Sequence, residues 1–230
     1  HRVESQSTDN KAKDITKMSD RFDEIDYKMD SLSTYLIMRH SFTIPNIESN
    51  EQFKAFKNIV LPKIGEVLDF LTHGNAEQVG HIKELLPMHP YTAFLCSEVS
   101  NFIGSSNRSV IKFMHDNDSG FEAFLNNENC YDGDMLMTAD TLWDFFYPTF
   151  DADPGSVTFT GLFNSFKDKV RAQGEDYLRV FKVILLLNAL SPKFKKSIEL
   201  MTPNDHVLRC MFAGDRVYSK VIDILNYLDE

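Results

Sequence analysis

Apolar residues recur every three or four positions through most of the chain, a spacing that places them on one face of an α-helix. The clearest series is Ile15, Met18, Phe22, Ile25 and Met29, with acidic residues on the opposite face. We call this series the N-terminal stripe. It predicts one long amphipathic helix over residues 15–38. A coiled-coil arm, a linker helix and a terminal helix packed on the body all fit this pattern.

The same spacing predicts shorter helices along the rest of the chain, separated by proline, glycine and polar turns. They cover residues 51–61, 64–71, 77–85, 91–103, 107–115, 121–125, 141–146, 160–172, 176–190, 207–212 and 216–228. No sustained alternation of apolar and polar residues occurs, so no strand is predicted. We therefore predict an all-α fold, an irregular multi-helix bundle.

Composition narrows the class of protein. The chain has 230 residues, of which 43% are hydrophobic, and this balance excludes wholesale disorder. No run of 18 uncharged apolar residues is present, so no membrane span is predicted. The three cysteines, Cys96, Cys130 and Cys210, form no CxxC pair. This cysteine usage predicts a reducing, cytoplasmic environment. The first residue is His rather than Met and no signal-peptide pattern follows, so we expect a piece of a longer protein.

The net charge of −10 is concentrated in one stretch. Residues 113–166 contain ten Asp and Glu and no Lys or Arg. Such a surface repels phosphate, which argues against nucleic acid as a partner of this chain alone. DNA binding by the C-terminal helices would depend on Arg209, Arg216 and Lys220, and nearby acidic residues outnumber these cations. A protein partner suits the acidic, aromatic stretch better.

The sequence contains none of the motifs GxxxxGKS, GxxxxGKT, GxGxxG, GxSxG and HExxH. The chain therefore cannot hold a triphosphate through a P-loop of its own, and we expect neither catalytic residues nor a cofactor in it. His73, His81 and His89 are eight residues apart, but Gly74 and two prolines interrupt any helix that would align them. We expect surface and turn histidines there rather than a metal site.

Two further features have ordinary structural interpretations beside functional ones. Residues 116–120 form an Asx-rich turn that lacks the ligands of a calcium-binding EF-hand loop at the required positions. The aromatic residues 143–147 fit core packing, with a partner-binding patch as the alternative.

A helix start at residues 105–108 is the most informative feature. Ser105 and Ser106 are candidate caps, and Arg108 falls in the first turn, where a cation opposes the helix dipole. Such a cation calls for an anionic partner. Either a carboxylate within the fold or the phosphate of a ligand would serve.

Three segments together resemble a known family. LPMHPYTAFL at residues 86–95, SNRSVIKFM at 106–114 and DYLRVFKVILLLNAL at 176–190 are similar to elements of large bacterial AAA-like P-loop ATPases. These ATPases belong to phage-defence and DNA-processing systems. The resemblance covers about residues 80–190.

The resemblance implies that the chain is the helical lid and post-lid region of such an ATPase. Residues 1–40 would be a long helix or linker, 41–172 a helical lid-like domain, and 173–230 a truncated winged-helix-like module. Arg108, with Asn107 beside it, would sense the nucleotide. The core of the parent protein would hold this nucleotide, ATP, together with Mg²⁺. Partners would be other domains or subunits of the parent protein, including a homo-oligomer. The alternative is a helical protein-interaction module that binds a partner or dimerises through the N-terminal helix and the acidic aromatic segment.

Overall fold

The computed structural model of the chain describes residues 31–43, 51–102, 106–126, 136–193 and 198–229. Within these ranges the chain is helical and contains no strand, which confirms the all-α prediction. The α-helices are α2 (Ser31–His40), α3 (Glu51–Thr72), α4 (Ala76–Lys83), α5 (Pro90–Phe102), α6 (Ser106–Met114), α7 (Phe121–Leu125), α8 (Asp140–Ala152), α9 (Val157–Arg171), α10 (Glu175–Leu190), α11 (Ile198–Met201), α12 (Asp205–Met211) and α13 (Val221–Leu228). The 3-10 helices η1 (Ser191–Lys193) and η3 (Tyr218–Lys220) connect some of these described helices.

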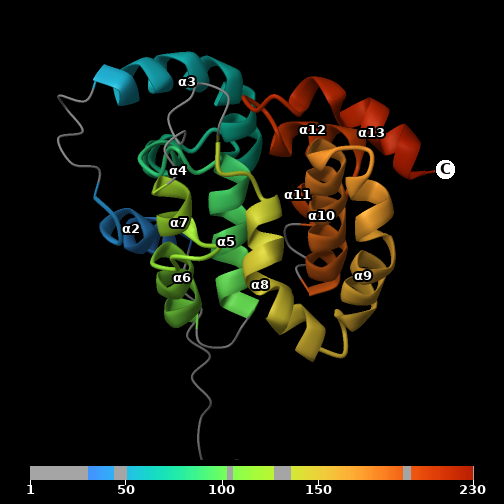
Figure 1. Cartoon of the computed structure of the whole chain (residues 1–230). Helices are drawn as coiled ribbons and strands as arrows, with labels where there is room; N and C mark the ends of the chain where they lie inside the picture. Colours follow the sequence, from blue (N-terminus) through green and yellow to red (C-terminus); the bar gives the residue numbers. More distant parts are fainter. Residues whose placement is uncertain (1–30, 44–50, 103–105, 127–135, 194–197, 230) are drawn as a thin grey trace, which may run out of the picture.

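Two helices sit at the centre of the packing. Helix α5 contacts α2, α3, α6 and α12, while α10 contacts α8, α9, α12 and α13. In Figure 1, α2 lies on one side of the body and α9 and α13 on the other, with α5, α8 and α10 between them. Among the described helices, none combines the length and the apolar composition that crossing a bilayer requires.

Helix α3 corrects one prediction. Residues 51–61 and 64–71 form a single helix of 22 residues that runs through Pro62. A proline inside a helix removes the hydrogen bond to the carbonyl four residues earlier, here that of Asn58. Both residues are exposed, so water can hydrate this carbonyl. The buried side chains of α3 continue on both sides of the proline and hold the helix together.

Helix α8 is longer than predicted for the same reason. It covers residues 140–152 instead of 141–146 and contains an exposed proline, Pro148. Three buried side chains, Trp143, Phe146 and Phe150, bind it to the core across this proline. Their burial and ring contacts agree with the core-packing interpretation of the aromatic cluster.

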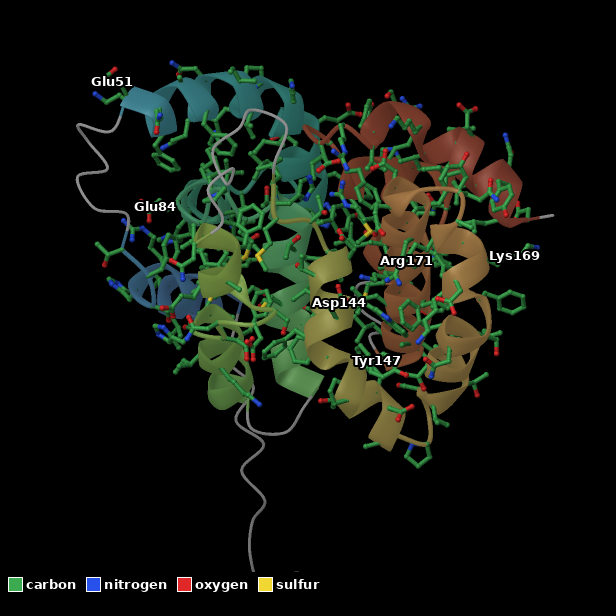
Figure 2. All side chains as sticks on the ribbon, viewed as in Figure 1. Glu51, Glu84, Asp144, Tyr147, Lys169 and Arg171 are labelled. Carbon is green, nitrogen blue, oxygen red and sulfur yellow. The ribbon has the colours of Figure 1, made fainter. Side chains whose placement is uncertain are left out.

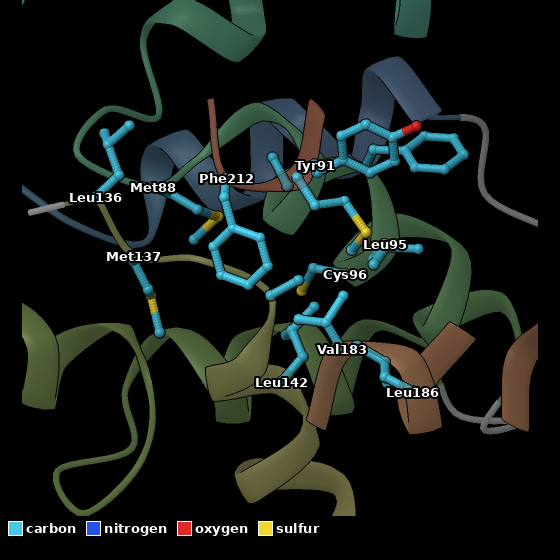
Figure 3. Close-up of a cluster of buried hydrophobic side chains, with 14 of the residues drawn as sticks. Met88, Tyr91, Leu95, Cys96, Leu136, Met137, Leu142, Val183, Leu186 and Phe212 are labelled. Atoms are coloured by element: carbon cyan, nitrogen blue, oxygen red, sulfur yellow. The ribbon is translucent and has the colours of Figure 1, made fainter. Parts of the chain in front are cut away.

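The core is one continuous cluster of buried side chains contributed by helices from α2 to α13. Its centre, between α5, α8, α10 and the segments around Met137 and Phe212, is drawn in Figure 3. The predicted boundary at residues 172 and 173 falls in the turn between α9 and α10. The domain division and the winged-helix-like assignment of residues 173–230 remain predictions. Most of the predicted 15–38 helix lies outside the described residues, which begin with α2.

Candidate functional site: a buried polar junction

The segment before α5 is tied to a distant part of the chain by backbone hydrogen bonds. Met137 N–H donates to the Pro87 carbonyl at 3.0 Å, and His89 N–H donates to the Met137 carbonyl at 3.0 Å. The Thr92 hydroxyl donates to the same Met137 carbonyl at 2.8 Å. The start of α5 is therefore fixed against the segment that leads into α8.

His89 extends this connection to a third segment. Its ring is fully buried, its Nδ1 accepts a hydrogen bond from Tyr91 N–H at 3.1 Å, and its Nε2 lies 3.0 Å from the Ala213 carbonyl. Since a carbonyl can only accept, Nε2 carries the proton. Burial lowers the pKa of His89 to about 3, so the ring is neutral at physiological pH. His89 thus caps the first turn of α5, in the manner of an N-cap residue, and anchors it to the turn that follows α12.

Arg179 of α10 forms the charged half of the junction. Its two terminal nitrogens donate to the two carboxylate oxygens of Asp215 at 3.1 and 2.8 Å, and its Nη2 also donates to the Thr138 hydroxyl at 2.7 Å. Its Nε lies 3.4 Å from a carboxylate oxygen of Asp140. The guanidinium group lies over the Phe212 ring, 5.5 Å from its centroid. Only 18% of the Arg179 side chain is exposed, against 3% for Asp215.

One cation, Arg179, lies between two carboxyl groups in this network, those of Asp140 and Asp215. Burial alone would lower the pKa of Arg179. The charges of Asp140 and Asp215 outweigh this effect and raise the pKa above its usual value, so the guanidinium stays charged. Burial raises the pKa of Asp140 and outweighs the opposing effects of Arg179 and of the hydrogen bond from Thr138. Asp215 also accepts a hydrogen bond from Val217 N–H at 2.8 Å. We call the set His89, Thr138, Asp140, Arg179 and Asp215 the polar junction.

A cavity of about 290 Å³ borders the polar junction. Its lining includes Thr138, Asp140, Arg179 and Asp215, together with apolar side chains from Phe124, Leu136 and Met137. Most of the donors of Arg179 are already used within the protein, and His89 is a neutral, buried ring. These groups fit the role of a structural connection better than that of acid–base catalysis.

A second ionic cluster lies at the first turn of α10. Asp176 accepts hydrogen bonds from Lys220 Nζ at 2.6 Å and from Arg216 Nε at 3.3 Å. Burial alone would raise the pKa of Asp176, but these two cations lower it. The third cation considered for DNA, Arg209, donates to the Tyr218 hydroxyl at 3.2 Å. Asp176 therefore offsets part of the charge of Arg216 and Lys220, whereas the partner of Arg209 is a neutral hydroxyl.

The predicted sensor residues lie in the first turn of α6, as the sequence indicates. The structure places Asn107 and Arg108 directly after Ser106, the first residue of α6, while the positions of their side chains lie outside the described part. Helix α6 packs against α5, α2 and α7. The three histidines that are eight residues apart do not come together: His73 is exposed at the end of α3, and His89 is buried in the polar junction.

Sequence analysis missed one cysteine–histidine pair. His206 and Cys210 lie one helical turn apart on α12, with Nε2 and Sγ 3.7 Å apart, and the spacing of four residues was the available signal. Burial, aided by the charge of Glu66, raises the pKa of Cys210 to about 11. The thiol is therefore protonated at neutral pH and is not an activated nucleophile.

Sequence reasoning also did not identify the polar junction, because its members lie far apart along the chain. Comparison of the chain with protein-family models, with curated proteins and with solved structures found no match.

Proposed function

We propose that this chain is a non-catalytic helical segment of a larger P-loop ATPase, and that it senses the nucleotide state and relays it to partner domains or subunits. Arg108 is the proposed sensor, with Asn107 as its neighbour. ATP and Mg²⁺ would be bound by the core of the parent protein. The observation that supports this proposal best is that two of the segments that resemble the ATPases, 86–95 and 176–190, are held to the same turn after α12, His89 through the Ala213 carbonyl and Arg179 through Asp215.

The packing offers a physical route for such a relay. Helix α6, whose first turn contains Arg108, packs on α5. The start of α5 is in turn held by His89 and Met137. The same junction holds α10 through Arg179. Close-packed interiors transmit displacement because their side chains have little free volume to absorb it. A movement of α6 imposed by nucleotide would thus reach α10 and the C-terminal helices through α5.

The first test is the coding sequence that flanks this chain. We expect an open reading frame that continues upstream and encodes a GxxxxGKS or GxxxxGKT motif followed by a helix. A complete reading frame that encodes no such motif would remove the proposal.

The second test is Arg108→Ala in the parent protein. An arginine that stabilises charge on the transferred phosphoryl group contributes orders of magnitude to the rate, so we expect kcat for ATP hydrolysis to fall at least tenfold. Lys112→Ala is the matched control, because Lys112 is an exposed cation one turn further along α6. Both variants should keep the wild-type melting temperature. Unchanged kcat and nucleotide affinity in Arg108→Ala would refute the role of this residue.

A further inference from the structure

A cysteine and a histidine lie one turn apart on α12, at the edge of a cavity. Cys210 Sγ and His206 Nε2 are 3.7 Å apart, and either tautomer of the ring places one proton between them. Both residues line a cavity of about 360 Å³ between α3, α12 and the segment from η3 to α13. The same spacing of four residues brings the two histidines of an HExxH motif to one zinc ion. The pair therefore has the spacing of metal ligands on a helix.

The distance between the two atoms also matches that of neighbouring ligands on a metal ion. Zinc binds thiolate sulfur at about 2.3 Å and imidazole nitrogen at about 2.0–2.1 Å, and a tetrahedral arrangement then separates the two ligand atoms by about 3.5 Å. The observed 3.7 Å is close to this value. A metal ion that replaces the shared proton would therefore require little movement of either side chain.

Packing favours this arrangement of the two side chains. The His206 ring makes a T-shaped contact with the Phe70 ring of α3, with ring centroids 4.8 Å apart and an interplanar angle of 79°. Cys210 is buried, so the close-packed core limits the rotation of its side chain. The two ligand atoms are thus held together before an ion arrives, which reduces the entropy cost of binding.

The charges nearest the sulfur favour a cation. Burial is the main cause of the raised pKa of Cys210, and the charge of Glu66 raises it by more than the charge of Arg209 lowers it. These two groups together therefore make the electrostatic potential at the sulfur negative. Asp205 and Lys63 also line the cavity and carry opposite charges.

We propose that Cys210 and His206 bind a zinc ion, with water molecules in the remaining coordination positions. Thiolate and imidazole are ligands that zinc favours, whereas magnesium and calcium take oxygen ligands. Binding releases the thiol proton to solvent, so that Cys–SH and Zn²⁺ give Cys–S–Zn⁺ and H⁺. Within the described residues, no third side chain of His, Cys, Asp or Glu joins the pair in a metal-binding cluster. Two protein ligands, half the number of a structural zinc site, predict a Kd on the order of 1–100 μM at pH 7.

This proposal does not depend on the ATPase proposal, and Co²⁺ is the probe that tests it. Cobalt takes the place of zinc and gives a charge-transfer absorption band when a thiolate binds it. Titration of the 230-residue chain with Co²⁺ should produce this band and release one proton for each ion bound. Zn²⁺ should displace the cobalt and remove the band, whereas excess Mg²⁺ should leave it unchanged.

Substitutions assign the band to the two ligands. Cys210→Ser should abolish it, and His206→Gln should raise the Kd for Co²⁺ at least tenfold. His206 is exposed, so its replacement leaves the buried core intact. Cys130→Ser removes another thiol, and His40→Gln removes an exposed histidine at the end of α2. These two matched controls should leave both the band and the Kd unchanged.

A second pair of variants tests the contribution of charge. Glu66→Gln should weaken Co²⁺ binding about two- to fivefold, as expected for an exposed charge near the ion. Glu51→Gln is the matched control, because Glu51 lies at the end of α3 that is far from α12 (Figure 2), and it should have no effect. The absence of a band up to about 1 mM Co²⁺, a band that persists in Cys210→Ser, or an unchanged Kd in His206→Gln would each overturn the proposal.

Discussion

Replacement of Arg179 by methionine tests whether the polar junction holds the helices together. Methionine keeps much of the length of the side chain but removes its charge and all its donors. Asp215, only 3% exposed, would retain the hydrogen bond from Val217 N–H and lose both bonds from Arg179. Asp140 would lose its nearest cation, at 3.4 Å.

Removing one partner of a buried ion pair costs about 3–5 kcal/mol, because the other charge stays buried without compensation. Since 18% of the Arg179 side chain reaches solvent, we expect the lower end of this range, about 3 kcal/mol. For a chain of this size that corresponds to a melting temperature lower by roughly 6–12 °C. Urea unfolding at pH 7, followed by circular dichroism, measures the difference in the free energy of unfolding.

Arg171→Met is the matched control. Arg171 pairs with Glu175 at 3.4 Å, but their side chains are 54% and 65% exposed. An exposed pair of this kind contributes less than about 1 kcal/mol. The difference in the free energy of unfolding between Arg179→Met and wild type should become smaller on acidification, because the carboxyl groups that Arg179 no longer pairs with are then neutral. Equal losses in the two variants, or a loss in Arg179→Met that does not change with pH, would show that the junction does not act as an ion pair.

Three further predictions concern groups with separate physical roles. The pKa of His89 lies at about 3 in the folded chain, below its unfolded value of about 6.5, so wild-type stability should fall from pH 6.5 towards pH 4. His89→Asn should flatten this fall in pH-dependent urea unfolding by at most about 1.4 kcal/mol per pH unit. The lowered pKa of Asp176 stabilises the fold above its unfolded pKa, so Asp176→Asn should cost roughly 0.5–1 kcal/mol at pH 7 and progressively less as the pH falls below about 4. Pro62→Ala restores the hydrogen bond to the Asn58 carbonyl and should raise the midpoint of thermal unfolding, and an unchanged or lower midpoint would contradict the account of α3.

The fold was predictable where the apolar residues of a single helix repeat with the helical period. Periodicity places α5, α6, α9 and α10 to within a few residues, because a buried face repeats along each of them. It fails at Pro62 and Pro148, where contacts with the rest of the core outweigh a local preference to end the helix. Helix α11 has only four residues, too few for a period to appear.

The candidate site was less predictable, because it depends on contacts between distant positions. Thr138, Arg179 and Asp215 are separated by about forty residues at each step, and no short motif contains two of them. The sequence predicts a turn histidine at His89, and only the fold shows that its ring bonds to the Ala213 carbonyl. A single sequence carries no sign of such pairings.

The polar junction also bears on how the proposed relay could work. Replacing all members of a buried ion network together by apolar residues is often neutral or stabilising, unlike the removal of one member, so stability alone does not require an arginine at the centre of three segments. Such a network is satisfied in one arrangement only, since any shift of α10 relative to Asp215 or Asp140 leaves buried charge unpaired. We infer that Arg179 and His89 fix the relative positions of α5, α10 and the end of α12 more than they add to the free energy of folding. A segment that passes movement from α6 to its C-terminal helices needs such a fixed connection. Without it, side chains of the core would rearrange around the displaced α6, and α10 would not move.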